Sequence, residues 1–242
     1  MNKEKMIAGV CALILLLTPF ASGYAGWGDF LKTVQKTLDG SSGTSQGEIV
    51  DALKEALEIG TAKTVQALSQ LDGYYGNPKL KIPLPQSVQT AEGVLRATGF
   101  GAPVDAFELS MNRAAEQAAP EAEALFVDAI KAMTISDATQ ILKGADNAAT
   151  VYFKDKTSSQ LQDIFKPIVH ASMETVGVTQ TYQSVSEKIQ TIPFAANYAL
   201  DLDAYVTEKS IDGLFIRLAE EEARIRNDPA ARVTDLLKKV FQ

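Results

Sequence analysis

The chain has one cysteine and one histidine among its 242 residues, and each scarcity excludes a kind of chemistry. The lone histidine, His170, rules out zinc sites with two histidines and the paired Glu-x-x-His di-iron sites of helical bundles. The lone cysteine, Cys11, lies in an N-terminal apolar run that we expect to be removed, so the rest of the chain has no disulfide and no thiol nucleophile. No P-loop, dinucleotide-binding G-x-G-x-x-G motif or EF-hand loop occurs, and we expect no cofactor and no metal.

Positive charge is also scarce. Lysine and arginine total 23 against 30 aspartate and glutamate residues, which gives a formal net charge of −7, and no basic block occurs. An acidic chain of this kind binds nucleic acids and anionic membranes poorly, so we expect no nucleic-acid partner.

Residues 1–25 have the three-part layout of a secretory signal peptide. Lys3 and Lys5 form a short basic leader, residues 6–17 form an apolar run, and the small residues at 23–25 fit a cleavage site. The run is shorter than the roughly 20 residues that a membrane anchor needs, although an uncleaved anchor is the alternative. We therefore expect a periplasmic or secreted protein with no transmembrane segment in its mature form.

The remaining chain divides into an arm and a helical domain. Residues 26–46 combine a short amphipathic segment with a flexible linker rich in glycine and serine. Residues 47–242 place apolar residues at helical spacing and show almost no strand-like alternation. The sequence therefore predicts an all-α fold, a single multi-helix bundle-like domain.

Small polar residues and glycines predict several helix ends. Ser136 is positioned to cap a helix that stops at Gly144. Residues 145–153 are expected to form another short helix, and Thr157 or Ser158 to cap the helix after it. Further helices are predicted from Gln86 to Gly99 and from Asp228 to Val240.

Residues 71–85, with the sequence LDGYYGNPKLKIPLP, interrupt the helical pattern. Asp72-Gly73 and Asn77-Pro78 are turn-forming pairs, and two later prolines stiffen an extended path. We interpret this segment as a strap loop across the bundle, fixed by its tyrosine hydroxyls and by Asp72. The alternative is a loop that walls a binding cleft, in which Asp72 and Tyr74 contact a ligand.

The strongest candidate site lies in the segment FELSMNRAAEQAAP, residues 107–120. Glu108, Asn112 and Glu116 are four residues apart and share one stripe of a helix, with Arg113 beside it. Asparagine has a low intrinsic helix propensity, so an asparagine inside a helix calls for another explanation. Three interpretations are open: a solvated face with an Arg–Glu pair, a buried structural network, or the wall of a pocket for a polar ligand.

The segment VYFKDKTSSQ, residues 151–160, holds a second candidate ligand site. Tyr152 and Phe153 point to different helix faces, and Lys154 and Lys156 form a compact basic spot. Tyr152 and Lys156 could therefore bind an anionic small molecule; the alternative is that the segment only leads to Thr157 or Ser158 as the cap of the next helix.

The apolar spacing also places two further polar residues, Glu222 and His170, on their helices. Glu222 falls between Leu218 and Ile225 on an apolar helix face, so it is either part of a charged face or a buried carboxylate paired with an arginine. The helical spacing pairs Glu222 with Arg226 and Glu220 with Arg224. On its own helix His170 lies off the apolar stripe, and we expect it at the surface beside Glu174.

Five separated blocks of the sequence resemble a family of secreted bacterial proteins known as domain of unknown function 4197. The resemblance covers roughly residues 47–242 and implies exported, helical, single-domain proteins without an assigned activity, so it supplies no catalytic residues. The blocks are LDGYYGNPKLKIPLP, ELSMNRAAEQAAPEA, AATVYFKDKTSSQL, YVTEKSIDGLFIRLAEEEARIRNDPAAR and the closing LLKKVF.

The function that these observations favour is a non-catalytic periplasmic binding or envelope-associated module, whose partner is a small molecule or an envelope protein. One alternative is a hydrolase of envelope polymers with Glu108 or Glu116 as its acid. On one helix these carboxylates lie about 12 Å apart along the axis, wider than the roughly 5–9.5 Å that glycosidases use. The other alternative is a self-assembling structural protein that docks residues 26–44 on a neighbouring copy.

Overall fold

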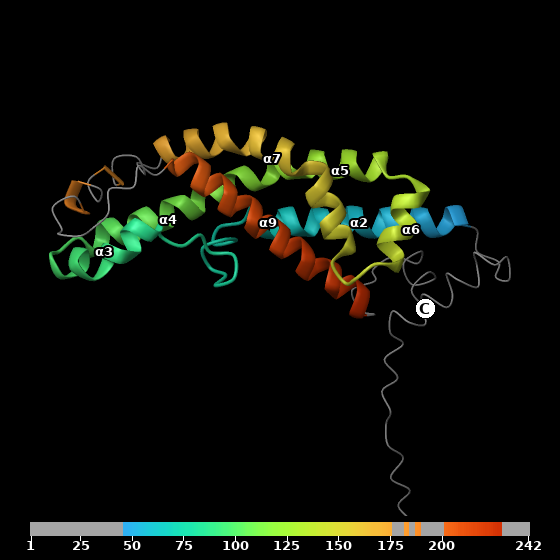
Figure 1. Ribbon diagram of the computed structural model, residues 1–242, viewed down its shortest axis with the longest axis horizontal. Helices are drawn as coiled ribbons and strands as arrows, with labels where there is room; N and C mark the ends of the chain where they lie inside the picture. The colour runs from blue at the N-terminus through green and yellow to red at the C-terminus, as the bar shows by residue number, and fades with distance from the viewer. Residues whose placement is uncertain (1–45, 176–181, 184–186, 190–200, 229–242) are drawn as a thin grey trace, which may run out of the picture.

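The computed structural model describes residues 46–175, 182–183, 187–189 and 201–228, and within these ranges the chain forms helices and no strands (Figure 1). The predicted all-α fold is confirmed. The predicted signal peptide, the N-terminal arm and the helix expected from Asp228 to Val240 lie outside the described residues, apart from Gln46, which begins α2, and Asp228. None of the helices in the described ranges is long and apolar enough to cross a membrane. In chain order the elements are α2 Gln46–Leu68, α3 Gln86–Ala97, α4 Gly101–Ala118, the 3₁₀ turn η1 Ala119–Glu121, α5 Ala122–Ala132, α6 Ile135–Lys143, α7 Ala148–Thr175 and α9 Leu202–Asn227.

The helices form an elongated bundle, with α3 near one end and α6 near the other (Figure 1). Helix α7 packs along α4, α5 and α9, while α9 also crosses α2 obliquely. The crossing is close at Gly60 of α2, where an added Cβ would lie 3.3 Å from Ile225 Cδ1. A glycine in the middle of this helix therefore makes room for the side chain of the neighbouring helix.

One apolar core runs through the bundle. The face of α4 that helical spacing predicts as its core side is fully buried, as are the alanines beside it. Phe126 of α5 meets Phe153 of α7 with ring centroids 5.1 Å apart, and Phe215 of α9 with centroids 6.4 Å apart. These edge-on ring contacts join three helices that are distant in sequence. The buried core face of α4 comprises Val104, Phe107, Met111, Ala114 and Ala118.

The prediction for α6 is right about its end and wrong about its cap. The helix begins at Ile135, and Thr134 is the capping residue. The Thr134 hydroxyl accepts a hydrogen bond from the Asp137 N–H, and the Asp137 carboxylate accepts one from the Thr134 N–H. Ser136, predicted as the cap, lies inside the first turn. The Thr134–Asp137 pair accepts hydrogen bonds from two N–H groups at the start of the helix, whereas a serine cap alone would accept only one.

The two helices predicted on either side of Thr157 are one continuous helix, α7, so that prediction is wrong. Thr157 and Ser158 do not cap, because their hydroxyls donate to the carbonyls of Phe153 and Lys154 one turn earlier. Pro167 also lies inside this helix. Burial of a long apolar stripe across α4, α5 and α9 keeps the segment helical through residues that would end an isolated helix. The fully buried members of this stripe are Phe153, Leu161, Phe165 and Val169.

Residues 71–85 form the predicted strap, which connects α2 and α3 without regular structure (Figure 1). Asp72 has a φ of 65°, in the left-handed region that aspartate tolerates better than most residues. The Gly76 N–H donates to the Asp72 carbonyl at 2.9 Å, which closes a turn. Three apolar side chains from the second half of the strap are buried in the core, and they are Leu80, Ile82 and Leu84.

Candidate functional site

Asn112 of α4 binds the main chain of the strap at Ile82. Its Oδ1 accepts from the Ile82 N–H at 2.8 Å, and its Nδ2 donates to the Ile82 carbonyl at 3.0 Å. The same Nδ2 donates to the Glu108 carbonyl at 2.8 Å, so both amide hydrogens are used. The side chain is 0% exposed. Asn112 thus satisfies strap backbone groups that would otherwise be buried without partners.

Glu116, one turn further along α4, holds the beginning of the strap. Its Oε1 accepts from the N–H groups of Tyr74 at 3.1 Å and Tyr75 at 3.3 Å. Its Oε2 accepts from Arg113 Nη1 at 2.6 Å, and Arg113 Nη2 donates to Asp72 Oδ1 at 2.7 Å. The buried carboxylate therefore has a cation and two backbone donors as partners, which offset the cost of removing it from water.

Tyr74 anchors the strap on α9. Its fully buried ring packs so closely on Gly213 that a Cβ there would lie 2.6 Å from Tyr74 Cε1. The hydroxyl donates to the Ser210 carbonyl at 2.7 Å. Burial, with a smaller contribution from the negative charge of Glu116, raises the pKa of Tyr74 far above its ordinary value. Tyr74 is therefore a neutral hydrogen-bond donor throughout the physiological pH range.

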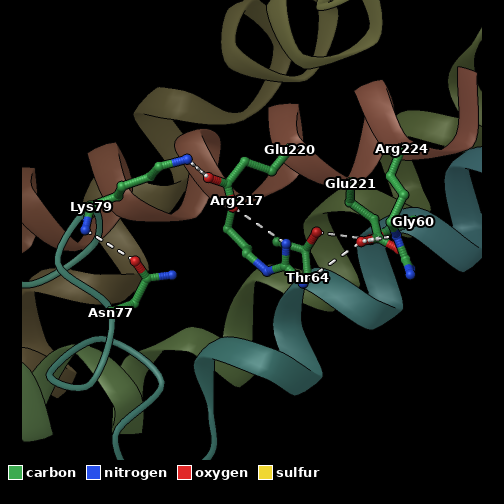
Figure 2. A network of polar contacts seen from close by, with 8 residues as sticks. All are labelled: Gly60, Thr64, Asn77, Lys79, Arg217, Glu220, Glu221 and Arg224. Atoms are coloured by element: carbon green, nitrogen blue, oxygen red, sulfur yellow. Dashed lines mark hydrogen bonds and ion pairs between the residues drawn. The ribbon is translucent and has the colours of Figure 1, made fainter. Parts of the chain in front are cut away.

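Three outer contacts complete the attachment of the strap. Lys81 Nζ lies 2.7 Å from Glu108 Oε2, and this hydrogen bond raises the pKa of Lys81. Lys79 Nζ lies 2.9 Å from Glu220 Oε1 of α9, as Figure 2 shows. The Tyr205 hydroxyl donates to the Pro83 carbonyl at 2.9 Å. The strap is thus bound by α4 on one side and by α9 on the other.

Six of the eight candidate residues from the sequence come together in this network. The strap buries Asn112 and Glu116 of the α4 stripe, as the buried-network interpretation expects, whereas Glu108 and Arg113 remain partly exposed. The polar groups predicted to meet a ligand are bound to the strap or to one another, so we place no ligand here. Glu108 and Glu116, the acids of the hydrolase alternative, are both engaged in these contacts. The six residues are Asp72, Tyr74, Glu108, Asn112, Arg113 and Glu116.

Glu222 is buried, and it caps another helix. Its carboxylate accepts from the N–H groups of Ala149 at 2.9 Å and Thr150 at 2.8 Å, and from the Thr150 hydroxyl at 2.8 Å. The predicted partner Arg226 donates from Nε at 2.9 Å and from Nη2 at 2.6 Å. A negative charge at the N-terminus of α7 also interacts favourably with the helix dipole. The position of Glu222 on an apolar helix face indicates that it is buried. Its role as a cap of α7 could not be predicted, because it depends on how α9 packs on α7.

Glu221, which does not stand out in the sequence, is fully buried where α9 faces α2 (Figure 2). Arg224 binds its carboxylate on one side, and Arg217 Nη2 lies 3.7 Å away on the other. The predicted pair of Glu220 with Arg224 is wrong: Glu220 instead contacts Lys79 and Arg217. The tight crossing of α2 and α9 buries Glu221, and the spacing of residues along α9 alone does not show which face α2 covers.

The other two candidate residues, Tyr152 and Lys156, lie on α7 beside two surface hollows. The Tyr152 hydroxyl donates to the Ala129 carbonyl of α5 at 3.0 Å, which fixes the ring, and Lys156 Nζ lies 5.8 Å from the ring centroid. The first hollow, about 390 Å³, lies between α5 and α7, and the second, about 500 Å³, lies between α6 and α7. Asp137, Tyr152 and Lys156 line both hollows. We call the two adjoining hollows the α7 groove.

Most of the polar side chains around the α7 groove were not singled out from the sequence. They come from α5, α6, α7 and the loops before α6 and α7, and the spacing of residues along one helix cannot show that these segments lie together. The pKa of Asp137 is lowered by hydrogen bonds from the Thr134 hydroxyl and N–H, so this carboxylate is ionised at neutral pH. Burial, followed by the charge of Asp137, raises the pKa of Tyr152. The polar residues that line one hollow or the other are Asp128, Thr134, Gln140, Asn147, Asp155, Thr157 and Gln160.

His170 lies at the surface of α7, as predicted. Its Nε2 lies 3.4 Å from Glu174, the expected partner, and its Nδ1 lies 2.8 Å from Asp203 of α9. The described residues contain no group of three or more His, Cys, Asp or Glu side chains arranged to hold a metal ion. His170 therefore links the surfaces of α7 and α9.

Comparison with known proteins gives a single finding. A search of curated proteins and a search of solved structures returned no match. The family model described as "Protein of unknown function (DUF4197)" matches residues 43–242, which include every helix described above. The chain therefore belongs to the DUF4197 family of proteins of unknown function.

Proposed function

We propose that this chain is an exported, non-catalytic binding protein that holds a small molecule in the α7 groove. The observation that carries the proposal is the pair of hollows that meet at Asp137, Tyr152 and Lys156. Their volumes, about 390 and 500 Å³, lie in the range of ligand sites in proteins. The lining of the groove combines apolar side chains with polar and charged ones that could orient a ligand.

Rigid placement of the groove residues supports this proposal. Tyr152 is tied to α5 by its hydroxyl, and Asp137 is tied to Thr134 in the capping pair. Both side chains therefore keep their positions before a ligand arrives, which lowers the entropy lost on binding.

A non-catalytic role is supported by the engagement of the buried carboxylates. Glu116, Glu221 and Glu222 each receive an arginine, and two of them also receive backbone N–H groups. A general acid or base must lie within hydrogen-bond reach of a substrate, and these three carboxylates are buried and already bonded to the protein itself.

Export is proposed from the sequence pattern of residues 1–25, which lie outside the described residues. The expected location is the periplasm or the medium. Tracking the protein in cell fractions, with and without residues 1–25, tests this; retention in the cytoplasm with an intact N-terminus would contradict it.

Thermal shift measurements test the binding proposal. The full chain is expressed, and the purified protein is titrated with neutral oligosaccharides, amino acids, short peptides, polyamines, inorganic phosphate and pyrophosphate. At least one class is expected to raise the melting temperature, because a ligand that binds only the folded state stabilises it. Lys156→Ala should reduce the shift, whereas Lys154→Ala, which removes an exposed lysine of the same helix outside the groove, should not. No shift with any class, or equal loss in both variants, would overturn the proposal.

A further inference from the structure

We infer that the α7 groove takes a linear, neutral carbohydrate, an inference that rests on the proposed binding function. It begins with the shape of the groove. One hollow is walled by α5 and the other by α6, and α7 contributes residues to both. Two adjoining hollows fit a chain-like ligand that places successive units on either side of Tyr152 and Lys156.

The charges around the groove favour a neutral ligand over the anionic one suggested by the two lysines of this segment. Three carboxylates line the hollows, those of Asp128, Asp137 and Asp155, and Lys156 is the one cation among the lining residues. Lys131 lies 3.8 Å from Asp128 and offsets part of that charge. An anion would meet like charges in both hollows, which is unfavourable.

The hydrogen-bonding groups at the rim match hydroxyl groups. Gln160 in the first hollow, and Gln140 and Asn147 in the second, are exposed amides that both donate and accept. A sugar hydroxyl also donates and accepts, so an amide or carboxylate can bind two neighbouring hydroxyls at once. Tyr152, at the junction, adds an aromatic surface of the kind that packs on the C–H face of a sugar ring.

The apolar lining of the groove favours a carbohydrate over a peptide. It consists of four alanines with Leu125, Ile141 and Val151, so it offers little of the wide apolar surface by which a groove recognises a peptide helix. The walls are helices, whose backbone groups are bonded internally, so an extended peptide finds no strand edge to pair with. The four alanines of the lining are Ala129, Ala132, Ala145 and Ala148.

Isothermal titration with a neutral oligosaccharide tests the inference. The probe is tetra-N-acetylchitotetraose, called chitotetraose below, because the N-acetylated sugar carries no charge. It is compared with di-N-acetylchitobiose (chitobiose), pyrophosphate, spermidine and tetra-alanine, and the protein is the purified full chain. Chitotetraose is expected to bind, and to bind more tightly than chitobiose because it reaches both hollows. Gln160→Ala and Asn147→Ala each remove one amide from one hollow and should weaken chitotetraose binding about three- to tenfold, the loss of one or two hydrogen bonds.

The control is Gln162→Ala, which removes an exposed amide from the same helix outside both hollows and should leave chitotetraose binding unchanged. All three changes are at exposed positions, and melting temperatures equal to that of the unaltered protein will show that the fold is retained.

The outcomes separate this inference from the proposed function. One outcome is that chitotetraose does not bind, while pyrophosphate, spermidine or tetra-alanine binds and Lys156→Ala weakens that binding. This result would overturn the inference of a carbohydrate ligand and would support the groove as a binding site for another molecule. Chitotetraose binding that Gln160→Ala and Asn147→Ala leave unchanged would place the sugar elsewhere and also overturn the inference. No binding by any probe would overturn both.

Discussion

Two regions of this protein place polar side chains on helices and use them in opposite ways. Between α4 and α9, the side chains of Asn112 and Glu116 are buried and bonded to the backbone of the strap. Along α7, Lys156 and the amides of Gln140 and Gln160 are exposed beside two hollows. The comparison teaches that the same polar residue types serve the chain itself where another segment covers them, and remain open to solvent where none does.

The largest expected effect is at the centre of the strap network. Tyr74→Ala removes a fully buried ring and leaves the Ser210 carbonyl without this donor, so the free energy of unfolding should fall by about 4 kcal/mol. Urea unfolding followed by circular dichroism measures it. Tyr74→Phe, which keeps the ring and loses only the hydrogen bond, should cost about 1 kcal/mol. If the two variants are equally stable, the ring does not anchor the strap.

A smaller loss is expected for the residue that binds the strap backbone. Asn112→Ala leaves the buried Ile82 N–H and carbonyl without partners, which should cost about 3 kcal/mol. Hydrogen exchange at the Ile82 amide should accelerate more than exchange at amides of α7, because the strap opens before the bundle. A change of less than about 0.5 kcal/mol would show that water replaces the asparagine and that the strap is not held by its backbone.

The cap of α7 should contribute less again. Glu222→Gln keeps the shape of the side chain and removes the charge that faces two N–H groups and Arg226, so we expect a loss of about 2 kcal/mol. Glu220→Gln on the same helix removes a carboxylate that is 31% exposed, and should cost less than about 0.5 kcal/mol. Thermal unfolding of both variants measures the difference, and equal losses would contradict a specific role for Glu222.

The smallest effect on stability is expected in the α7 groove. Lys156→Ala, at an exposed position, should change the free energy of unfolding by less than about 0.5 kcal/mol. If the contrast between the regions is right, this variant loses ligand binding and keeps stability, whereas Asn112→Ala loses stability. A strong destabilisation by Lys156→Ala would make the α7 segment structural as well.

Much of the local structure could be predicted from the residues. Turn-forming pairs marked the strap, glycines marked the ends of α3 and α6, and apolar spacing marked the core face of α4. These signals are local, because each depends on backbone preferences or on the period of a single helix. They failed at Thr157 and Ser136, where a hydroxyl had two local uses and the surrounding structure selected one.

The candidate residues could be found, but their roles could not. Asn112 and Glu108 stood out in the sequence as polar residues in a helix, yet their partner is a strap about 30 positions away. The polar rim of the α7 groove did not stand out at all, since its residues are ordinary surface side chains of three helices and two loops. Packing decides which distant segments lie together, and the spacing of residues within one helix does not predict that packing.

By itself, the sequence determined the helical class, the position of the strap and the candidate polar positions on α4 and α7, because backbone preference and apolar spacing act over a few residues. Only the tertiary structure decided that α4 binds the strap, that Glu222 caps α7 and that two hollows meet beside Tyr152. The physical reason is that burial and hydrogen-bond partners depend on which segments the core brings together, and these segments are far apart along the chain.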